Sequence, residues 1–335
     1  MYSVLRQLLF KLEPEVAHAL VLKGLIPLTA MMPNRLDWAA YQRPTHAFGL
    51  LFPNPIGLAA GLDKNAECVS AFSKLGFGFV EVGTLTPRPQ IGNPKPRLFR
   101  LVNQSALINR MGFNNKGIDY FQRVIKLQKY SCRLGVNIGK NKDTPNENAH
   151  EDYLYCFNKA YPYADYITVN ISSPNTPGLR ALQEERGLKL ILESLCEARE
   201  RFVQVFGKYV PLVIKVAPDL SGEQLQQFAE VINQYPVQGV IATNTTISRP
   251  GLEKDPLAKE AGGLSGKPLA ALSISVLTIL KKALNSDIDI VSAGGIDSAV
   301  SAQERFELGA RLIQVYTGLI YQGPDLIKAL IPNAL

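Results

Sequence analysis

The stretch LVIKVAPDLSGEQLQQFAEVINQYPVQGVIAT, residues 212–243, decides the fold. Its two ends, LVIKV (212–216) and GVIAT (239–243), are nearly continuous apolar runs, as is typical of parallel strands covered on both faces. Between them, residues 221–235 have the apolar spacing of an amphipathic helix. The stretch therefore predicts one strand–helix–strand unit of a parallel sheet.

The same unit recurs along the chain from Pro55 onward. Short apolar or β-branched runs are each followed by Gly, Asn, Ser or Pro and then by residues with helical spacing. The predicted strands are residues 56–60, 79–83, 134–138, 166–170, 212–216, 239–243, 288–293 and 312–316. The predicted helices include residues 66–75, 152–161, 188–206, 221–235, 269–284 and 299–308. Eight units match the size and strand number of an α/β protein of the (β/α)8 TIM barrel type.

Two regions depart from this rhythm. Residues 1–45 hold two short amphipathic stretches, 2–12 and 14–25, followed by Pro27, Pro33 and Pro44. They predict a short N-terminal helical extension, joined by a proline-rich connector to a barrel over residues 46–335. Residues 87–115 are rich in Pro, Asn and Arg and are too long for a simple crossover, so we expect an excursion over the barrel mouth.

Composition excludes disordered and fibrous classes, because 46% of the 335 residues are hydrophobic and 19% are charged. The net charge of +7 suits anionic substrates, an acidic lipid surface or nucleic acid without choosing among them. The four cysteines lie far apart and have no metal-ligand spacing with the histidines, which predicts reduced thiols and no metal site. The longest uncharged window, residues 231–248, contains Asn, Gln, Thr and Pro, so no membrane span is predicted.

Glycine-rich loops follow the last three predicted strands. Gly262 to Gly266, Gly294-Gly295 and Gly318 would let backbone N–H groups approach a phosphate near helix N-termini. Phosphate binding after strands seven and eight is a recurring use of this fold. The alternative is that these glycines only form tight turns, but three such loops together favour a phosphate.

Lys215 lies within an apolar strand, where an unpaired ammonium would be costly to bury. An ion pair with a carboxylate on a neighbouring strand is the alternative to an anionic or electron-rich ligand, but Asp63 is the only acid near the predicted mouth. Flat amides that suit the edges of a heteroaromatic ring follow several strands, at Asn137, Asn170, Asn175 and Asn244. The set favours a flavin and a planar, imide-like substrate over a sugar or a metal.

Hydrolytic chemistry lacks its usual groups in this sequence. His18, His46 and His150 are expected at the surface or at helix caps, and Cys68 and Cys156 as small buried residues. Ser173 lies in a proline-bounded loop after the fourth strand, without a GxSxG pattern or a histidine to activate it. A hydrolase is therefore not expected.

Read in order, the motifs at these positions resemble those of the quinone-dependent, class 2 dihydroorotate dehydrogenases of pyrimidine biosynthesis. They are GLAAGLDKN (57–65), GTLTPRPQ (83–90), NRMGFNN (109–115), NIGKNKDTP (137–145), NISSPNTPGLR (170–180), IKVAPDL (214–220), ATNTT (242–246) and GGLSG (262–266). NRMGFNN and NISSPNTPG in register are the most specific, and the resemblance covers essentially the whole chain. It implies oxidation of (S)-dihydroorotate to orotate, with FMN as hydride acceptor and a membrane quinone as the final electron acceptor.

The resemblance also implies roles for particular residues. It makes Ser173 the catalytic base, where the soluble class 1 relatives have a cysteine, and we expect Thr176 and an ordered water on its proton route. FMN would be held by Ala59, Ala60, Gly61, Leu62, Asp63, Lys64, Thr84, Asn137, Asn170, Lys215, Thr243, Gly266, Gly295, Tyr316 and Thr317. Dihydroorotate would be bound by Lys64, Asn109, Arg110, Met111, Gly112, Phe113, Asn170, Asn175, Asn244 and Thr245.

The resemblance further implies peripheral attachment through residues 1–45 to an anionic membrane surface, at the cytoplasmic face of the inner cell membrane. Two other functions have to be weighed against this. Reduction of uridine in transfer RNA would suit the positive charge, but it calls for a cysteine acid at the mouth and a basic helical domain, and neither is evident. A non-catalytic phosphate-binding barrel would leave Lys64, Lys215 and the four asparagines unexplained, so no nucleic-acid partner is expected.

Overall fold

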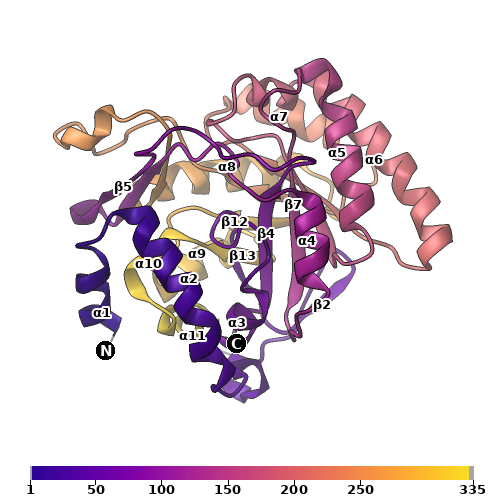
Figure 1. Ribbon diagram of the computed structural model, residues 1–335. Coiled ribbons are helices and arrows are strands. Elements are labelled where there is room, and N and C mark those ends of the chain that lie inside the picture. The colour runs from indigo at the N-terminus through magenta and orange to yellow at the C-terminus, as the bar shows by residue number, and fades with distance from the viewer. Residues whose placement is uncertain (1, 332–335) are drawn as a thin grey trace.

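The computed structural model describes residues 2–331, which form a closed barrel of eight parallel strands surrounded by helices (Figure 1). Consecutive barrel strands pair along the chain, and the last closes onto the first. This confirms the predicted (β/α)8 barrel. Residues 332–335, at the end of the predicted barrel range, lie outside the described residues. The barrel strands are β3 (Ile56–Leu58), β4 (Phe79–Leu85), β7 (Arg133–Ile138), β8 (Tyr166–Asn170), β9 (Leu212–Val216), β10 (Gly239–Ala242), β12 (Asp289–Ala293) and β13 (Leu312–Val315).

The helices that cover the barrel follow the predicted pattern. The helix between β9 and β10 begins with a capping box, in which Ser221 and Gln224 each bond the other's backbone N–H. Its apolar face, including Leu225, Phe228 and Ile232, is buried against the barrel. The covering helices are α3 (Val69–Lys74), α4 (Ile118–Ile125), α5 (Ala149–Ala160), α6 (Glu185–Phe206), α7 (Gly222–Ile232), α8 (Ala270–Ala283), α9 (Ala299–Glu307), α10 (Thr317–Gln322) and α11 (Asp325–Leu330).

A short hairpin that the sequence did not reveal closes the amino-terminal end of the barrel. Its strands β1 (Thr45–Ala47) and β2 (Leu50–Phe52) are antiparallel. Phe52 packs edge-on against Phe79 of β4, with ring centroids 5.3 Å apart, and both belong to one buried cluster with Tyr166. The barrel floor is therefore filled with side chains, and the barrel interior is closed at this end.

The N-terminal helices α1 (Tyr2–Leu9) and α2 (Pro14–Ala30) lie against one side of the barrel (Figure 1). Helix α2 runs past the predicted end at residue 25, so Pro27 lies inside it and not in the connector. Its last carbonyls are held by Lys74 of α3, whose Nζ donates to Thr29 O at 2.9 Å and to Ala30 O at 3.2 Å. This tertiary contact stabilises a helix end that local sequence does not specify.

The excursion after β4 carries a small sheet of its own. Strands β5 (Leu98–Leu101) and β6 (Ala106–Asn109) pair antiparallel, and β11 (Gly263–Gly266) pairs with β6. Arg97, just before β5, forms a buried ion pair with Glu15 of α2, with Nη2 3.0 Å from Oε1. The excursion thus connects the N-terminal helices to the barrel mouth. Within residues 2–331, the helices are all too short or too polar to cross a membrane.

Candidate active site

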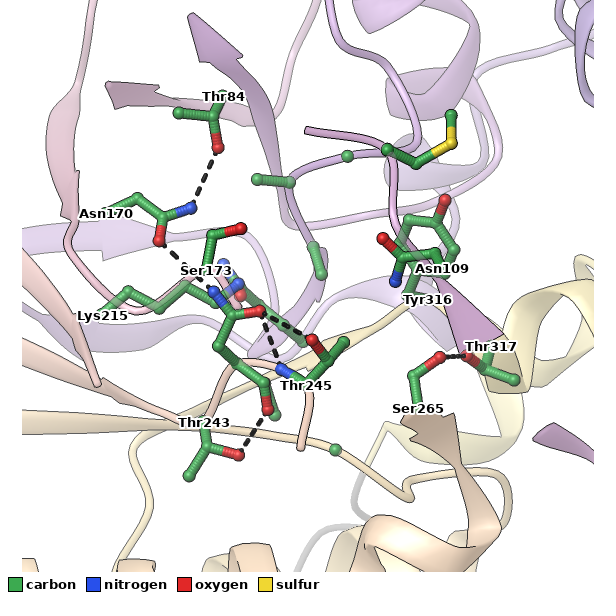
Figure 2. Close-up of a pocket in the computed structure, with 18 of the residues that line it drawn as sticks. Thr84, Asn109, Asn170, Ser173, Lys215, Thr243, Thr245, Ser265, Tyr316 and Thr317 are labelled. Atoms are coloured by element: carbon green, nitrogen blue, oxygen red, sulfur yellow. Dashed lines mark hydrogen bonds between the residues drawn. The ribbon is translucent and has the colours of Figure 1, made fainter. Parts of the chain in front are cut away.

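One large cavity opens at the carboxyl ends of the barrel strands (Figure 2). Its volume is about 1070 Å³ when the space at its open mouth is counted, which is at the upper end for small-molecule sites. The predicted site residues that line it are Ala59, Ala60, Gly61, Lys64, Thr84, Asn109, Met111, Gly112, Phe113, Asn170, Ser173, Asn175, Lys215, Thr243, Asn244, Thr245, Gly266, Gly295, Tyr316 and Thr317. The structure thus brings together residues from seven of the eight barrel strands or the loops that follow them, all but β7, and from the excursion.

Four predicted site residues do not line the cavity. Leu62 is buried behind it, and Asn137 lies in the barrel interior below it. The Asp63 carboxylate accepts from the backbone N–H groups of Glu67 and Cys68 at 2.9 and 2.8 Å, at the start of α3, and burial raises the pKa of Asp63 to about 6. Arg110 pairs with Glu260. Their side chains support the loops around the cavity.

The amides at the mouth are joined in one buried hydrogen-bond network (Figure 2). Thr84 Oγ1 donates to Asn137 Oδ1 at 2.6 Å and accepts from Asn170 Nδ2 at 2.9 Å. Asn170 Oδ1 in turn accepts from Asn244 Nδ2 at 3.3 Å. Because each amide is fixed by its neighbour, the network presents a pre-oriented polar surface to a flat ligand.

Ser173 lies at this surface, in the loop after β8 (Figure 2). It is 6% exposed, and its Oγ accepts a hydrogen bond from the backbone N–H of Asn175 at 3.2 Å. Thr176, three residues on, has a buried hydroxyl with no hydrogen-bond partner among the described residues. The loop is clamped by Arg180, whose Nε donates to Ser172 O at 3.1 Å and whose Nη2 donates to Thr245 O at 2.9 Å. The serine is therefore held rigidly at the cavity wall.

An acid that sequence reasoning missed lies directly below the cavity. Glu81 of β4 is fully buried in the barrel interior. The sequence had led us to expect Asp63 as the only acid near the mouth, and this expectation was wrong. Burial lowers the pKa of Lys215, and the charge of Glu81 opposes that shift. The signal that could have found Glu81 is the one that marked Lys215, a charged residue inside an apolar strand.

His18 is also misplaced by the sequence prediction, which put it at the surface or at a cap. Its Nε2 is 2.8 Å from the carbonyl oxygen of Leu62, in the loop that carries Lys64. Burial, and after it the charge of the nearby Lys64 ammonium, lower the pKa of His18 to about 4, so the ring is neutral at physiological pH. Lys64 itself donates to Gly61 O at 2.6 Å, and burial lowers its pKa to about 8. Helix α2 thus contacts the loop that presents a lysine to the cavity.

The glycine loops after β12 and β13 form one wall of the cavity. Gly295 adopts a φ of +74°, and a Cβ there would lie 2.5 Å from the backbone Cα of Ala270, so only glycine fits. Arg305 of α9 is fully buried and donates to Gly294 O at 3.1 Å. Thr317, just after β13, has its hydroxyl 2.8 Å from that of Ser265 (Figure 2). Rigid backbone N–H groups and hydroxyls of this kind fit a phosphate.

Fold and site together define a barrel enzyme with a mouth that suits a phosphate-bearing, planar cofactor. In residues 2–331, no group of three or more His, Cys, Asp and Glu side chains could hold a metal ion, and the four cysteines are free and buried. A flavin nucleotide fits three features of this mouth: the phosphate wall, the row of oriented amides, and the buried Lys215, which makes no ion pair or hydrogen bond among the described residues.

The chain belongs to the dihydroorotate dehydrogenase family, whose sequence pattern matches residues 44–333. It is 52% identical over 335 residues to the dihydroorotate dehydrogenase (quinone) of Idiomarina loihiensis, covering 99% of this chain and 100% of the relative. It is 53% identical over 331 residues to that of Coxiella burnetii, covering 98% and 95%. The crystal structure of the Eimeria tenella enzyme in complex with ferulenol matches with a TM-score of 0.87 and 39% identity, over 95% of this chain and 89% of that one. These findings favour the predicted family over the transfer RNA and non-catalytic alternatives.

Proposed function

We infer that this protein is a quinone-dependent dihydroorotate dehydrogenase, which oxidises dihydroorotate to orotate in pyrimidine biosynthesis. The observation that carries the inference is the convergence of Ser173, Lys215 and the mouth asparagines on one cavity, in a chain about half identical to enzymes of that name. We propose FMN as its cofactor and a membrane quinone as its electron acceptor.

The proposed FMN site runs from the amides to the glycine loops. Its phosphate would be held by the backbone around Gly266, Gly295 and Thr317, and its ring would be approached by Thr84, Asn170 and Lys215. The other predicted cofactor residues at the cavity, Ala59, Ala60, Gly61, Lys64, Thr243 and Tyr316, would complete the site. Bound FMN would supply a hydride acceptor, which the side chains of this cavity cannot provide themselves.

The proposed roles of the substrate residues follow from their chemistry. The Lys64 ammonium would oppose the substrate carboxylate, while Asn109, Asn175 and Asn244 would bond the imide edge of the ring. Ser173 would remove the proton from C5, and the unpartnered hydroxyl of Thr176 could relay it. The N–H of Asn175 bonded to Ser173 Oγ supports this role, because it stabilises negative charge on the oxygen.

We propose that residues 1–45 attach the protein to the membrane surface and give the quinone access. Apolar side chains are exposed along both N-terminal helices, at Val4, Leu5, Leu8, Leu12, Val16, Leu20 and Val21. Arg6, Lys11 and Lys23 lie among them and suit an anionic lipid surface. Peripheral attachment at the cytoplasmic face of the inner membrane fits helices of this length.

The test uses the purified full chain. The expected result is a yellow protein whose flavin absorbance is bleached by dihydroorotate and restored by a long-chain quinone, with no restoration by NAD or fumarate. Lys215→Ala should weaken FMN binding or slow bleaching while the circular dichroism spectrum stays unchanged. A folded protein that takes up no flavin, or whose flavin dihydroorotate does not reduce, would contradict the assignment.

A further inference from the structure

The barrel interior contains a carboxylate that the proposed reaction does not use. Glu81 projects inward from β4 and is fully shielded from solvent. Donors from strands β7, β8 and β13 converge on its two oxygens: Asn137 Nδ2 at 2.8 Å, Tyr166 OH at 3.0 Å, Thr168 Oγ1 at 3.1 Å and Gln314 Nε2 at 2.8 Å. Two amide groups and two hydroxyls that all donate to it form the pattern expected around an ionised carboxylate.

Lys215 is the buried cation on which the charge of Glu81 acts. It is 6% exposed and, in the part of the chain that the structure describes, makes no ion pair and donates no hydrogen bond. The residues in register with it on the neighbouring strands, Asn170 of β8 and Ile241 of β10, carry no charge. Tyr166 is the other titratable group of this interior, and burial raises its pKa well above the usual value, so it is neutral at physiological pH. Glu81 is thus the acid available to balance the buried ammonium.

Glu81 also connects to the amides that face the cavity. The Asn137 amide that donates to Glu81 accepts, through its oxygen, from Thr84 Oγ1 at 2.6 Å and from Asn170 Nδ2 at 3.2 Å. A carboxylate can only accept, so it turns the donor end of the Asn137 amide, Nδ2, toward Glu81. The acceptor end, Oδ1, is then left facing Thr84 and Asn170. The orientation of Asn170 at the cavity therefore depends, through Asn137, on the hydrogen-bond acceptor beneath it.

We propose that Glu81 is a positioning residue of the reaction: its carboxylate, held by four donors in the barrel interior, keeps Lys215 protonated below the flavin site and orients the Asn137 amide. This rests on the proposed function. Lys215 would then carry its charge across the whole physiological pH range, although it is buried in an apolar strand. The carboxylate acts through Lys215 and Asn137, since neither of its oxygens lines the cavity.

The test follows the Lys215 side chain directly in the flavin-loaded full chain, labelled with ¹³C at lysine Cε, with Lys215→Arg to assign its NMR signal. Glu81→Gln should lower the pH midpoint of the Lys215 signal by roughly one unit or more, as expected for the loss of an opposite buried charge nearby. Glu81→Asp, which keeps the charge, should leave the midpoint near that of the wild type. Thr168→Val removes one donor to Glu81 without changing the charge and is the matched control.

A Glu81→Gln midpoint within a few tenths of the wild-type value would overturn the proposal, as would an equal shift in Thr168→Val. If Glu81→Gln does not fold, the double variant Glu81→Gln/Lys215→Gln should restore a folded protein, because it removes the unbalanced ammonium as well. Failure of both to fold would also overturn it. Bleaching of the wild-type flavin by dihydroorotate is measured separately, so a failure of the proposed function is distinguished from a failure of this inference.

Discussion

The hydroxyl oxygen of Ser173 accepts a hydrogen bond from the backbone N–H of Asn175, 3.2 Å away, and lies at the cavity wall. The bond fixes the serine rotamer and stabilises negative charge on Oγ. This hydrogen bond alone does not make Ser173 an effective base for proton abstraction, because the pKa of a serine hydroxyl is far above neutral. The proton must also have a route out of the site.

Ser173→Ala should slow flavin reduction by dihydroorotate by about 10²-fold or more, because general base catalysis contributes about that much. Orotate should still bind with near-normal affinity, since the loss falls on proton abstraction and not on ground-state contacts. Ser173→Cys should retain more activity, most visibly at higher pH where the thiolate is populated. Stopped-flow absorbance and an orotate titration measure the two effects, and wild-type reduction rates in Ser173→Ala would show that another group removes the proton.

The pH dependence of ligand binding should report Lys64, whose pKa burial lowers to about 8. The ammonium is present below that pH and is lost as the pH rises through it, so orotate affinity should be constant from pH 6 to about 7.5 and fall above pH 8. The slope should approach tenfold per pH unit, because the neutral amine cannot pair with the substrate carboxylate.

Lys64→Arg is the control for this profile, since its guanidinium stays charged throughout. Its orotate affinity, even if weaker at pH 7, should not change between pH 7 and pH 10. The measurement is a spectral titration of the flavin with orotate at each pH. A wild-type affinity that is flat through pH 9, or an arginine variant with the same slope, would mean that another group binds the carboxylate.

Arg180 should matter to the rate because it joins the Ser173 loop to the loop after β10. Its Nη1 is held by Asp219 at 2.8 Å. Arg180→Lys keeps the charge but cannot reach both carbonyls, so flavin reduction should fall by about 10-fold or more, as expected when a charged hydrogen bond worth roughly 1.5–3 kcal/mol is lost. FMN affinity should stay near wild type.

Arg186→Lys in α6 is the matched control, because Arg186 is exposed and makes no hydrogen bond within residues 2–331. It should be indistinguishable from wild type in single-turnover reduction. If dihydroorotate bleaches the flavin of Arg180→Lys as fast as that of Arg186→Lys, the Arg180 side chain has no part in orienting Ser173.

The barrel was predictable from sequence because buried parallel strands such as LVIKV and GVIAT are apolar along nearly their whole length. The small sheet of β5, β6 and β11 was not, because its strands are only four residues long and β11 pairs with β6 across more than 150 residues of sequence, as with Gly263 and Asn109. Helix α2 extends past Pro27, and its end is held by Lys74 of α3, 44 residues or more away in sequence. In these places tertiary contacts, and not local pattern, determine the backbone.

The site residues likewise divide into those that local sequence pattern predicted and those that only tertiary contacts bring to the site. Most of its residues were found because they follow strand ends in a barrel, a position that topology alone makes functional. Glu81 was missed because it lies inside β4, two residues before Gly83, and reaches the site from below. His18 was missed because its partner, the Leu62 carbonyl, is 44 residues away in sequence. Neither contact leaves a periodic signal in the chain.

The N-terminal helices expose apolar side chains, but they also contact the excursion and the Lys64 loop. Deleting residues 1–40 would remove Glu15, leaving the buried Arg97 unpaired, and would also remove the His18 contact to the Lys64 loop. Loss of quinone activity in such a truncation could then come from a disturbed site. Substitution of exposed apolar residues avoids this, because Leu8 of α1 and Leu20 of α2 are 57% and 52% exposed and contribute little to the core.

Leu8→Gln/Leu20→Gln should spare flavin reduction by dihydroorotate and reoxidation by a small soluble dye. It should greatly slow reoxidation by a long-chain quinone and release the protein from anionic vesicles, since each leucine lost from an interface weakens partitioning by about tenfold. Val205→Gln/Val300→Gln, which alters exposed apolar residues of α6 and α9, is the matched control and should bind vesicles like the wild type. Vesicle sedimentation and quinone-dependent reoxidation measure the effects. If the leucine variant binds vesicles and uses long-chain quinone as well as the control does, the N-terminal helices only cover the barrel and the membrane contact lies elsewhere.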